Sequence, residues 1–389
     1  MSHLTAAQIA AHLAGTDPAA SEHVLECDEC AGAVAATELM AHATFGPGEV
    51  PTDGPRHSAT IEDALQQMTS PAVGTVKALL RAEAVACEQD PRRALELSNR
   101  AIAVGQTMTG DPTMVQLLRA RIWRERAGTY RALGEYDDGL AALDVAEREL
   151  DGVLVRAFED AQIAYTRATI LWKTRSDDQR ARALARAAGE VFLQHGDRLR
   201  SIHAQILLGG MDFVEGRYDT ARATFSAALP DAVALGDAAT IAYLHENIAA
   251  CAQELDDLPV AAIHYASAVA LFAHLEMKVE EFRAEWNRGL LSLQMGHVID
   301  GRTRLQRAAN GFLSHGNASD AALVTIDLAE HLAQAGDQAR ALEELRRISR
   351  SGVPAYVRVQ LDVLTGAMRR GNAEPAFRDV RIALLAPAP

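Results

Sequence analysis

Apolar residues recur at helical spacing from about Thr60 to the C-terminus, with polar residues between them. Short breaks that contain Gly, Asp or Asn separate these periodic segments. Such breaks end one helix and begin the next without leaving room for a strand. The pattern predicts an all-α chain built of helices joined in pairs.

The breaks return at a fixed interval, and each hairpin has a turn residue in the same frame. The turn residues are Gly216, Asp256, Gly296 and Gly336, and Gly134 lies two periods upstream to within two residues. The loops into the next pair keep the same period, with Gly196-Asp197, Gly236-Asp237 and Gly316-Asn317. A fixed period of about 40 residues is typical of solenoid arrays, and it predicts about eight helical hairpins over residues 60–389.

One copy of the repeat, from Trp123 to Ala146, carries a known spacing of large, small, aromatic and turn residues. Its marked positions are Trp123, Ala127, Tyr130, Gly134, Tyr136, Gly139, Leu143 and Ala146. This copy resembles the tetratricopeptide repeat (TPR) family. The period exceeds the family's usual length of about 34 residues, and one copy lacks a turn glycine around Arg175. The resemblance implies a TPR-like α-solenoid that binds proteins and does not catalyse a reaction.

Composition and charge narrow the possible partners. Hydrophobic residues make up 49% of the chain but aromatic residues only 5%, which favours helices packed through small side chains. A net charge of −14 argues against direct binding to nucleic acid, because phosphate contacts need clustered cations. The sequence has no apolar run long enough to span a membrane and no signal-peptide pattern, so we expect a cytoplasmic protein without membrane contact.

A stretch rich in Gly and Pro separates the array from a small N-terminal module. Six such residues fall within ten positions: Gly46, Pro47, Gly48, Pro51, Gly54 and Pro55. They predict a linker over residues 44–59, between a module at residues 1–43 and the repeats at residues 60–389. So short a module is too small to fold on a hydrophobic core alone.

That module contains His23, Cys27 and Cys30 in the arrangement H-x3-C-x2-C. Two thiolates two residues apart can hold one tetrahedral ion, with an imidazole from the preceding helix. A structural zinc needs a fourth ligand, and the choice lies between His3 and His12. If two short helices run antiparallel, His3 lies beside His23 and His12 lies roughly 13 Å away, so we prefer His3. A zinc site that releases its ion on oxidation, and a spacing without metal, stay open as alternatives.

The H-x3-C-x2-C segment is similar to the zinc-binding anti-sigma factor domain over about residues 3 to 43. The resemblance implies that His3, His23, Cys27 and Cys30 bind one structural Zn2+ and that the module binds a sigma factor. The stretch before His23 is shorter here than in that family. The module has several acidic residues and no Lys or Arg before Arg56, which suits a basic protein partner.

Three polar residues of the array are candidates for binding a second protein. Asn247 and Asn287 occupy equivalent positions on first helices, and Arg283 lies one turn before Asn287 on the same face. Related repeats place amides there, on the concave face of the array, toward a bound peptide. The alternative for all three is solvated helix surface.

Other noticeable residues have structural interpretations. We expect Cys87 and Cys251 to be buried, Trp123 and Tyr130 to pack within a repeat, and His195 and His315 to lie at helix ends. No phosphate-binding loop, nucleophile elbow or zinc-protease motif is present in the sequence.

These features together predict a non-catalytic cytoplasmic regulator. Its zinc module would bind a sigma factor, and its repeats would receive a second protein. Two alternatives stay open: a TPR adaptor, and an accessory subunit of a signalling or defence protease system, neither of which binds a sigma factor.

Overall fold

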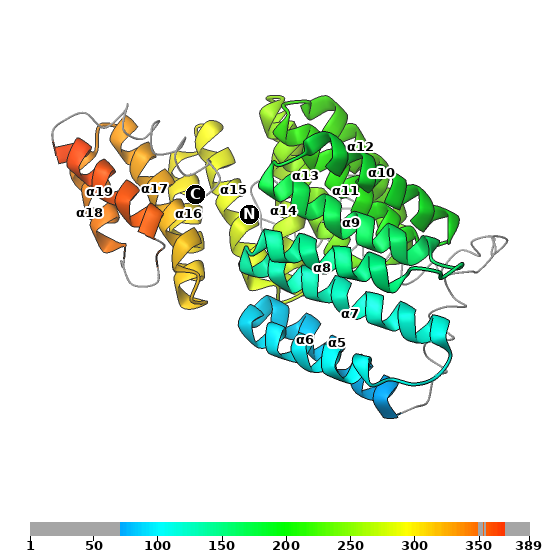
Figure 1. Cartoon of the computed structure of the whole chain (residues 1–389). Coiled ribbons are helices and arrows are strands. Elements are labelled where there is room, and N and C mark those ends of the chain that lie inside the picture. Colours follow the sequence, from blue (N-terminus) through cyan, green and yellow to red (C-terminus); the bar gives the residue numbers. More distant parts are fainter. Residues whose placement is uncertain (1–70, 349–352, 354, 370–389) are drawn as a thin grey trace. The chain divides into compact units, whose positions relative to one another are not determined.

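The computed structural model describes residues 71–348, 353 and 355–369, and the N-terminal module and the linker lie outside this range. The described residues form helices and no strand (Figure 1). The helices are α5 (Pro71–Gln89), α6 (Pro91–Gln106), α7 (Pro112–Leu133), α8 (Tyr136–Glu149), α9 (Ala157–Thr174), α10 (Asp178–Gln194), α11 (Arg198–Val214), α12 (Tyr218–Leu235), α13 (Ala238–Glu254), α14 (Leu258–His274), α15 (Lys278–Gln294), α16 (Val298–Ser314), α17 (Ala318–Gln334), α18 (Gln338–Arg347) and α19 (Ala355–Arg369).

The helices pair into hairpins in chain order, from α5 and α6 to α17 and α18, and α19 follows the last pair. Within the described range this makes seven hairpins and one further helix. The predicted TPR-like α-solenoid is therefore confirmed. The first helix of each pair has an odd number and the second an even one.

From α10 onward the helices begin at an interval that is shorter than the repeat period. Helices begin at residues 178, 198, 218, 238, 258, 278, 298, 318 and 338, so the interval between starts is constant at half the period. In this region both helices of a hairpin therefore occupy equal lengths of chain. Most of these helices are separated from the next one by a connection of three residues.

One residue of each of these connections has left-handed backbone geometry. Positive φ angles occur at Gly196, Gly216, Gly236, Asp256, Glu276, Gly296, Gly316 and Gly336. This conformation closes the last turn of the preceding helix and reverses the chain, and glycine adopts it without a steric penalty. Arg175, where no turn glycine is found, takes the same geometry with φ of 54°.

An Asp or Asn after the left-handed residue begins the next helix at several of these connections. The side chains of Asp197, Asp237 and Asn317 each accept a hydrogen bond from the backbone N–H three residues on, at 2.8 to 3.2 Å. Such caps satisfy one of the free amides at a helix start. The loops that carry the second marker of the repeat are thus helix stop and start signals.

Close contact between helices depends on small residues opposite aromatic rings. Phe282 of α15 lies against Gly311 of α16, where a Cβ on the glycine would be 2.5 Å from the ring. Phe225 of α12 packs in the same way on Gly209 of α11. As expected from the TPR resemblance, Trp123 and Tyr130 are half-buried and pack on the core formed by α7, α8 and α9.

The chain divides into two compact units. Among the described residues, the first unit ends at Asp231 and the second begins at Ala232, inside α12. Pro230, next to this boundary, has no N–H to donate to the hydrogen bonds of the helix backbone.

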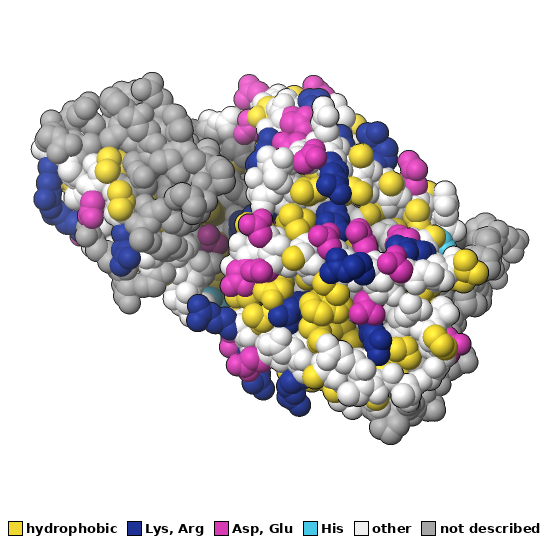
Figure 2. All heavy atoms as spheres, in the orientation of Figure 1, with side chains coloured by type: hydrophobic (Ala, Val, Ile, Leu, Met, Phe, Trp, Pro, Cys, Tyr) yellow, Lys and Arg dark blue, Asp and Glu magenta, His cyan; other side chains and the backbone are white. Residues whose placement is uncertain are grey.

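Figure 2 shows acidic and basic side chains intermixed on the first unit. There Arg167 of α9 lies 2.9 Å from Asp144 and 3.0 Å from Glu147 of α8. None of the described helices is long and apolar enough to cross a membrane.

Candidate functional site

In the second unit, polar side chains join consecutive first helices. We call the surface formed by these side chains on α13, α15 and α17 the first-helix face. Three hydrogen bonds cross it: Asn287 Nδ2 to Glu246 Oε1 at 3.2 Å, Gln253 Nε2 to Gln294 Oε1 at 3.0 Å, and Trp286 Nε1 to Asp327 Oδ2 at 2.8 Å. The two residues of every pair are 41 positions apart, one more than the repeat period. The face is therefore a regular polar ladder.

Glu246 is the most perturbed carboxyl of this face. Burial raises its pKa to about 7, although the charge of Arg283 and the hydrogen bond from Asn287 act in the opposite direction. Near neutral pH the side chain is therefore present both as a carboxylic acid and as a carboxylate. It can donate a hydrogen bond in the first form and only accept in the second.

Two of the three predicted partner-binding residues, Asn287 and Arg283, lie on this face. Asn247 is half-buried on α13, directly after Glu246. Asn287 and Arg283 lie on α15, and Arg283 reaches toward α17, with its Nη2 3.8 Å from Asp320 Oδ2. Asn287 and Arg283 both act on Glu246, so these two residues and the α13 carboxyl form one cluster.

This cluster still has hydrogen-bonding capacity for a ligand. An Asn amide has two N–H donors and a carbonyl acceptor, and the bond to Glu246 uses one donor of Asn287. The side chain of Arg283 is 43% exposed. Side-chain amides and a partly exposed guanidinium can pair with the backbone of an extended peptide and with an acidic group on it.

Several parts of the face were not expected from the sequence, among them the pair Gln253 and Gln294. Glu246, which directly precedes Asn247, was not predicted to take part. Nor was the pair Trp286 and Asp327, which joins α15 to α17. A search for polar pairs separated by one period plus one residue would have found all of them, once that offset was known.

The remaining sequence predictions have mixed outcomes. Cys251 is buried as expected and Cys87 is half-buried. His195 and His315 lie at the ends of α10 and α16 as expected. The Nδ1 of His315 is 3.0 Å from the Gly311 carbonyl oxygen, and the two imidazoles pack on the rings of Phe158 and Phe282, with 5.5 and 5.3 Å between centroids. In the described part of the chain no group of three His, Cys, Asp or Glu residues is placed to hold a metal ion. The predicted ligands His3, His23, Cys27 and Cys30, and the alternative His12, lie outside that part.

Comparison with known proteins identifies a fold. No protein-family model matches the chain, and no curated protein matches its sequence. The apo form of the quorum sensor NprR from B. thuringiensis has a TM-score of 0.58 and 13% identity over 84% of this chain and 91% of that one. A Rap protein complexed with Competence and Sporulation Factor has a TM-score of 0.53 and 13% identity over 97% and 100%. NprR in complex with its cognate peptide NprX has a TM-score of 0.53 and 15% identity over 84% and 90%. At such identities the likeness shows a shared helical-repeat fold.

Proposed function

We propose that the protein is a non-catalytic regulator that binds an extended peptide, or an extended segment of a partner protein, on its first-helix face. The observation that carries this proposal is the cluster of Arg283 and Asn287 of α15 with Glu246 of α13, on consecutive first helices of one unit. Asn247 follows Glu246 directly on α13. Solved structures of similar fold support it, because NprR is described in complex with its cognate peptide NprX and a Rap protein in complex with Competence and Sporulation Factor.

Removal of the two amides should weaken this binding. We expect the Asn247→Ala/Asn287→Ala variant to retain a native partner at least about tenfold less well than the wild type, because each lost hydrogen bond is worth on the order of 1 kcal/mol. The measurement is quantitative mass spectrometry of proteins and peptides co-purified from the native host. The matched control is Gln179→Ala, an exposed amide on the second helix α10. Equal recovery of every partner by wild type and double variant would contradict the proposal.

We also propose that residues 1–43 form a zinc-stapled module that binds a sigma factor. The support is the H-x3-C-x2-C segment, the acidic character of the module, and its similarity to anti-sigma domains. The two binding functions are separable, since one depends on the module and the other on the repeats. The alternatives are an adaptor, or an accessory subunit of a protease system, in which the module binds no sigma factor.

The zinc proposal predicts about one zinc ion per chain in protein purified without chelator. The Cys27→Ser/Cys30→Ser variant should lose this zinc and one partner, because the metal contributes most of the folding free energy of so small a module. The repeats should stay helical by circular dichroism. Cys87→Ser, which replaces a cysteine of α5, is the control and should keep the metal. The zinc proposal would be contradicted if the wild type contained no zinc, or if the double variant still bound every partner. Comparison of His3→Ala with His12→Ala then identifies the fourth ligand.

A further inference from the structure

A second polar surface lies away from the first-helix face, between the second helices α16 and α18. It is a cavity of about 530 Å³. Leu328 and Leu332 of α17 line it together with polar side chains of the two second helices: Arg302, Thr303, Gln306, Arg307 and Asn310 of α16, and Arg340 and Glu344 of α18. We call this cavity the α16–α18 groove. Its volume falls within the range of small-ligand and short-peptide sites.

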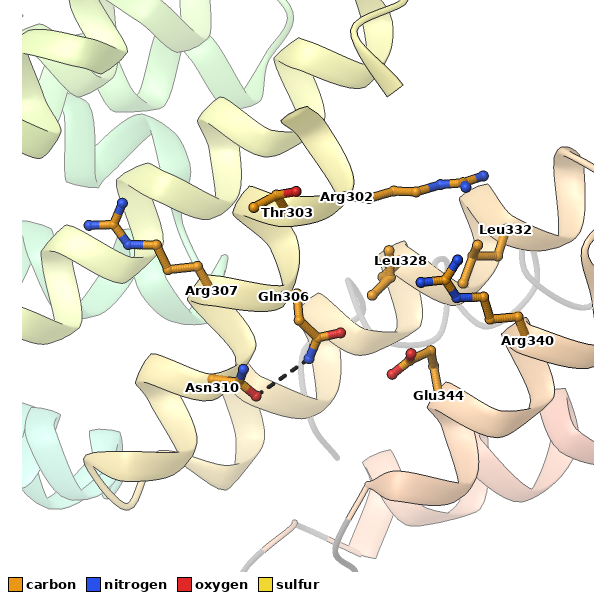
Figure 3. A pocket seen from close by; sticks show the side chains of 9 residues that line it. All are labelled: Arg302, Thr303, Gln306, Arg307, Asn310, Leu328, Leu332, Arg340 and Glu344. Atoms are coloured by element: carbon orange, nitrogen blue, oxygen red, sulfur yellow. Dashed lines mark hydrogen bonds between the residues drawn. The ribbon is translucent and has the colours of Figure 1, made fainter. Parts of the chain in front are cut away.

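Two arginines of the groove have no acidic partner. Figure 3 shows Arg302 and Arg340 extending from α16 and α18 toward the same space, with Leu328 and Leu332 of α17 between them. Among the described residues neither guanidinium makes an ion pair, and the buried Nε of Arg302 has no hydrogen-bond partner. A buried guanidinium N–H without an acceptor is costly, so a ligand that supplies one is favoured.

The other charges that line the groove are already paired. Arg307 points away from the cavity (Figure 3), and its Nη1 lies 3.5 Å from Glu285 Oε1 on α15. Glu344 Oε1 lies 3.1 Å from Arg347 Nη1, which offsets its negative charge. The net charge that the groove presents is therefore positive, in a chain whose formal charge is −14.

The groove has an apolar side as well. Leu328 and Leu332 form an apolar wall at the base of the cavity, and only 4% and 1% of their surfaces are exposed there. His331, next to Leu332 on α17, adds no positive charge at neutral pH, because burial and the nearby charge of Arg302 lower its pKa. The amides of Gln306 and Asn310 join each other through a bond of 3.4 Å, long enough to be exchanged for a bond to a ligand.

From this arrangement we infer that the α16–α18 groove binds a short acidic peptide segment, whose carboxylates lie between Arg302 and Arg340 and whose apolar side chains contact Leu328 and Leu332. Guanidinium groups form paired hydrogen bonds with carboxylates, and the apolar wall favours a peptide over a free ion. This site is independent of the first-helix face, which is formed by different residues.

The test uses the full-length protein and a fluorescein-labelled probe, Leu-Asp-Leu-Asp-Leu, followed by fluorescence anisotropy. We expect saturable binding that weakens as salt rises. Arg302→Gln and Arg340→Gln should each weaken it by about tenfold or more, because each removes a charge-assisted contact. Arg346→Gln, an exposed arginine of α18 that does not line the cavity, should bind like the wild type.

Two further probes separate the acidic peptide from other ligands. The isosteric peptide Leu-Asn-Leu-Asn-Leu should bind much more weakly, and inorganic phosphate should compete only at far higher concentration. Equal binding of the Asn peptide, equally tight binding of phosphate, no binding of the Asp peptide, or unchanged binding by both Arg→Gln variants would each overturn the inference. Asn247→Ala/Asn287→Ala should leave this binding unchanged, so failure here and failure at the first-helix face are distinguishable.

Discussion

Replacement of Arg304 by Met should lower the free energy of unfolding by about 3 kcal/mol at neutral pH, because it breaks a buried ion pair. Arg304 of α16 and Glu285 of α15 are both buried, at 8% and 1% exposure, with Arg304 Nη1 2.9 Å from Glu285 Oε1. Arg304 Nε also lies 2.8 Å from Asp300 Oδ2. Removal of one partner of a buried ion pair leaves the other charge in a poorly solvated place, and this costs far more than the intact pair contributes.

Urea unfolding of three variants tests this interpretation. Arg304→Met/Glu285→Leu should regain much of the lost stability, because it leaves no buried carboxylate without its closest partner. Arg307→Met should cost less than about 1 kcal/mol, since Arg307 is 54% exposed and lies farther from Glu285. If Arg304→Met cost no more than Arg307→Met, burial of the ion pair would not be the cause.

The buried carboxyl of Glu83 and the half-buried carboxyl of Glu246 should make the protein less stable as pH rises from about 4.5 to about 7. Burial raises the pKa of Glu83 and of Glu246 from 4.5 to about 7. Below pH 4.5 each group is protonated in both the folded and the unfolded chain and has no effect. Between the two values only the unfolded chain releases the proton, so the folded state loses stability, and above about pH 7 the loss is complete.

The corresponding variants are Glu83→Gln and Glu246→Gln. A pKa change of this size amounts to roughly 3 kcal/mol, so at pH 8 each variant should be more stable than the wild type by about 2 to 3 kcal/mol. At pH 4 each should match it. The amide introduced by Glu83→Gln would keep an acceptor for the Thr129 hydroxyl, which donates to Glu83 at 2.8 Å. Urea unfolding at pH 4, 6 and 8 measures the difference, with the exposed Glu96→Gln as control. A difference that did not change with pH would contradict the assignment.

The repeat was visible in the sequence because each turn requires a residue with left-handed backbone geometry. Left-handed geometry favours glycine, so Gly216, Gly296 and Gly336 mark the turns directly. Asp256 was found because it keeps the period of the other turns, whereas the left-handed residues Glu276 and Arg175 were not assigned as turns, since neither is a glycine. At those positions the packing of the flanking helices imposes the backbone conformation, and local preference does not reveal it.

The candidate sites were predictable to different degrees. A shared helix face was enough to group Arg283 with Asn287, because one helical turn separates them. Their contact with Glu246 was not predictable, because it depends on how far one hairpin is offset from the next. The groove was missed for a similar reason: Arg302 and Arg340 lie on different helices, and no short motif relates them.

The equal spacing of helix starts from residue 178 to residue 338 has a consequence for how such a chain can change in evolution. One inserted residue within a helix would turn all later side chains of that helix by about 100° and expose its buried stripe. Loss of a whole period, for example residues 277–316, would instead place Glu276 directly before Asn317 and restore a left-handed residue followed by a capping residue. Relatives of this chain should therefore differ in length mainly by whole repeat periods, through gain and loss of entire hairpins.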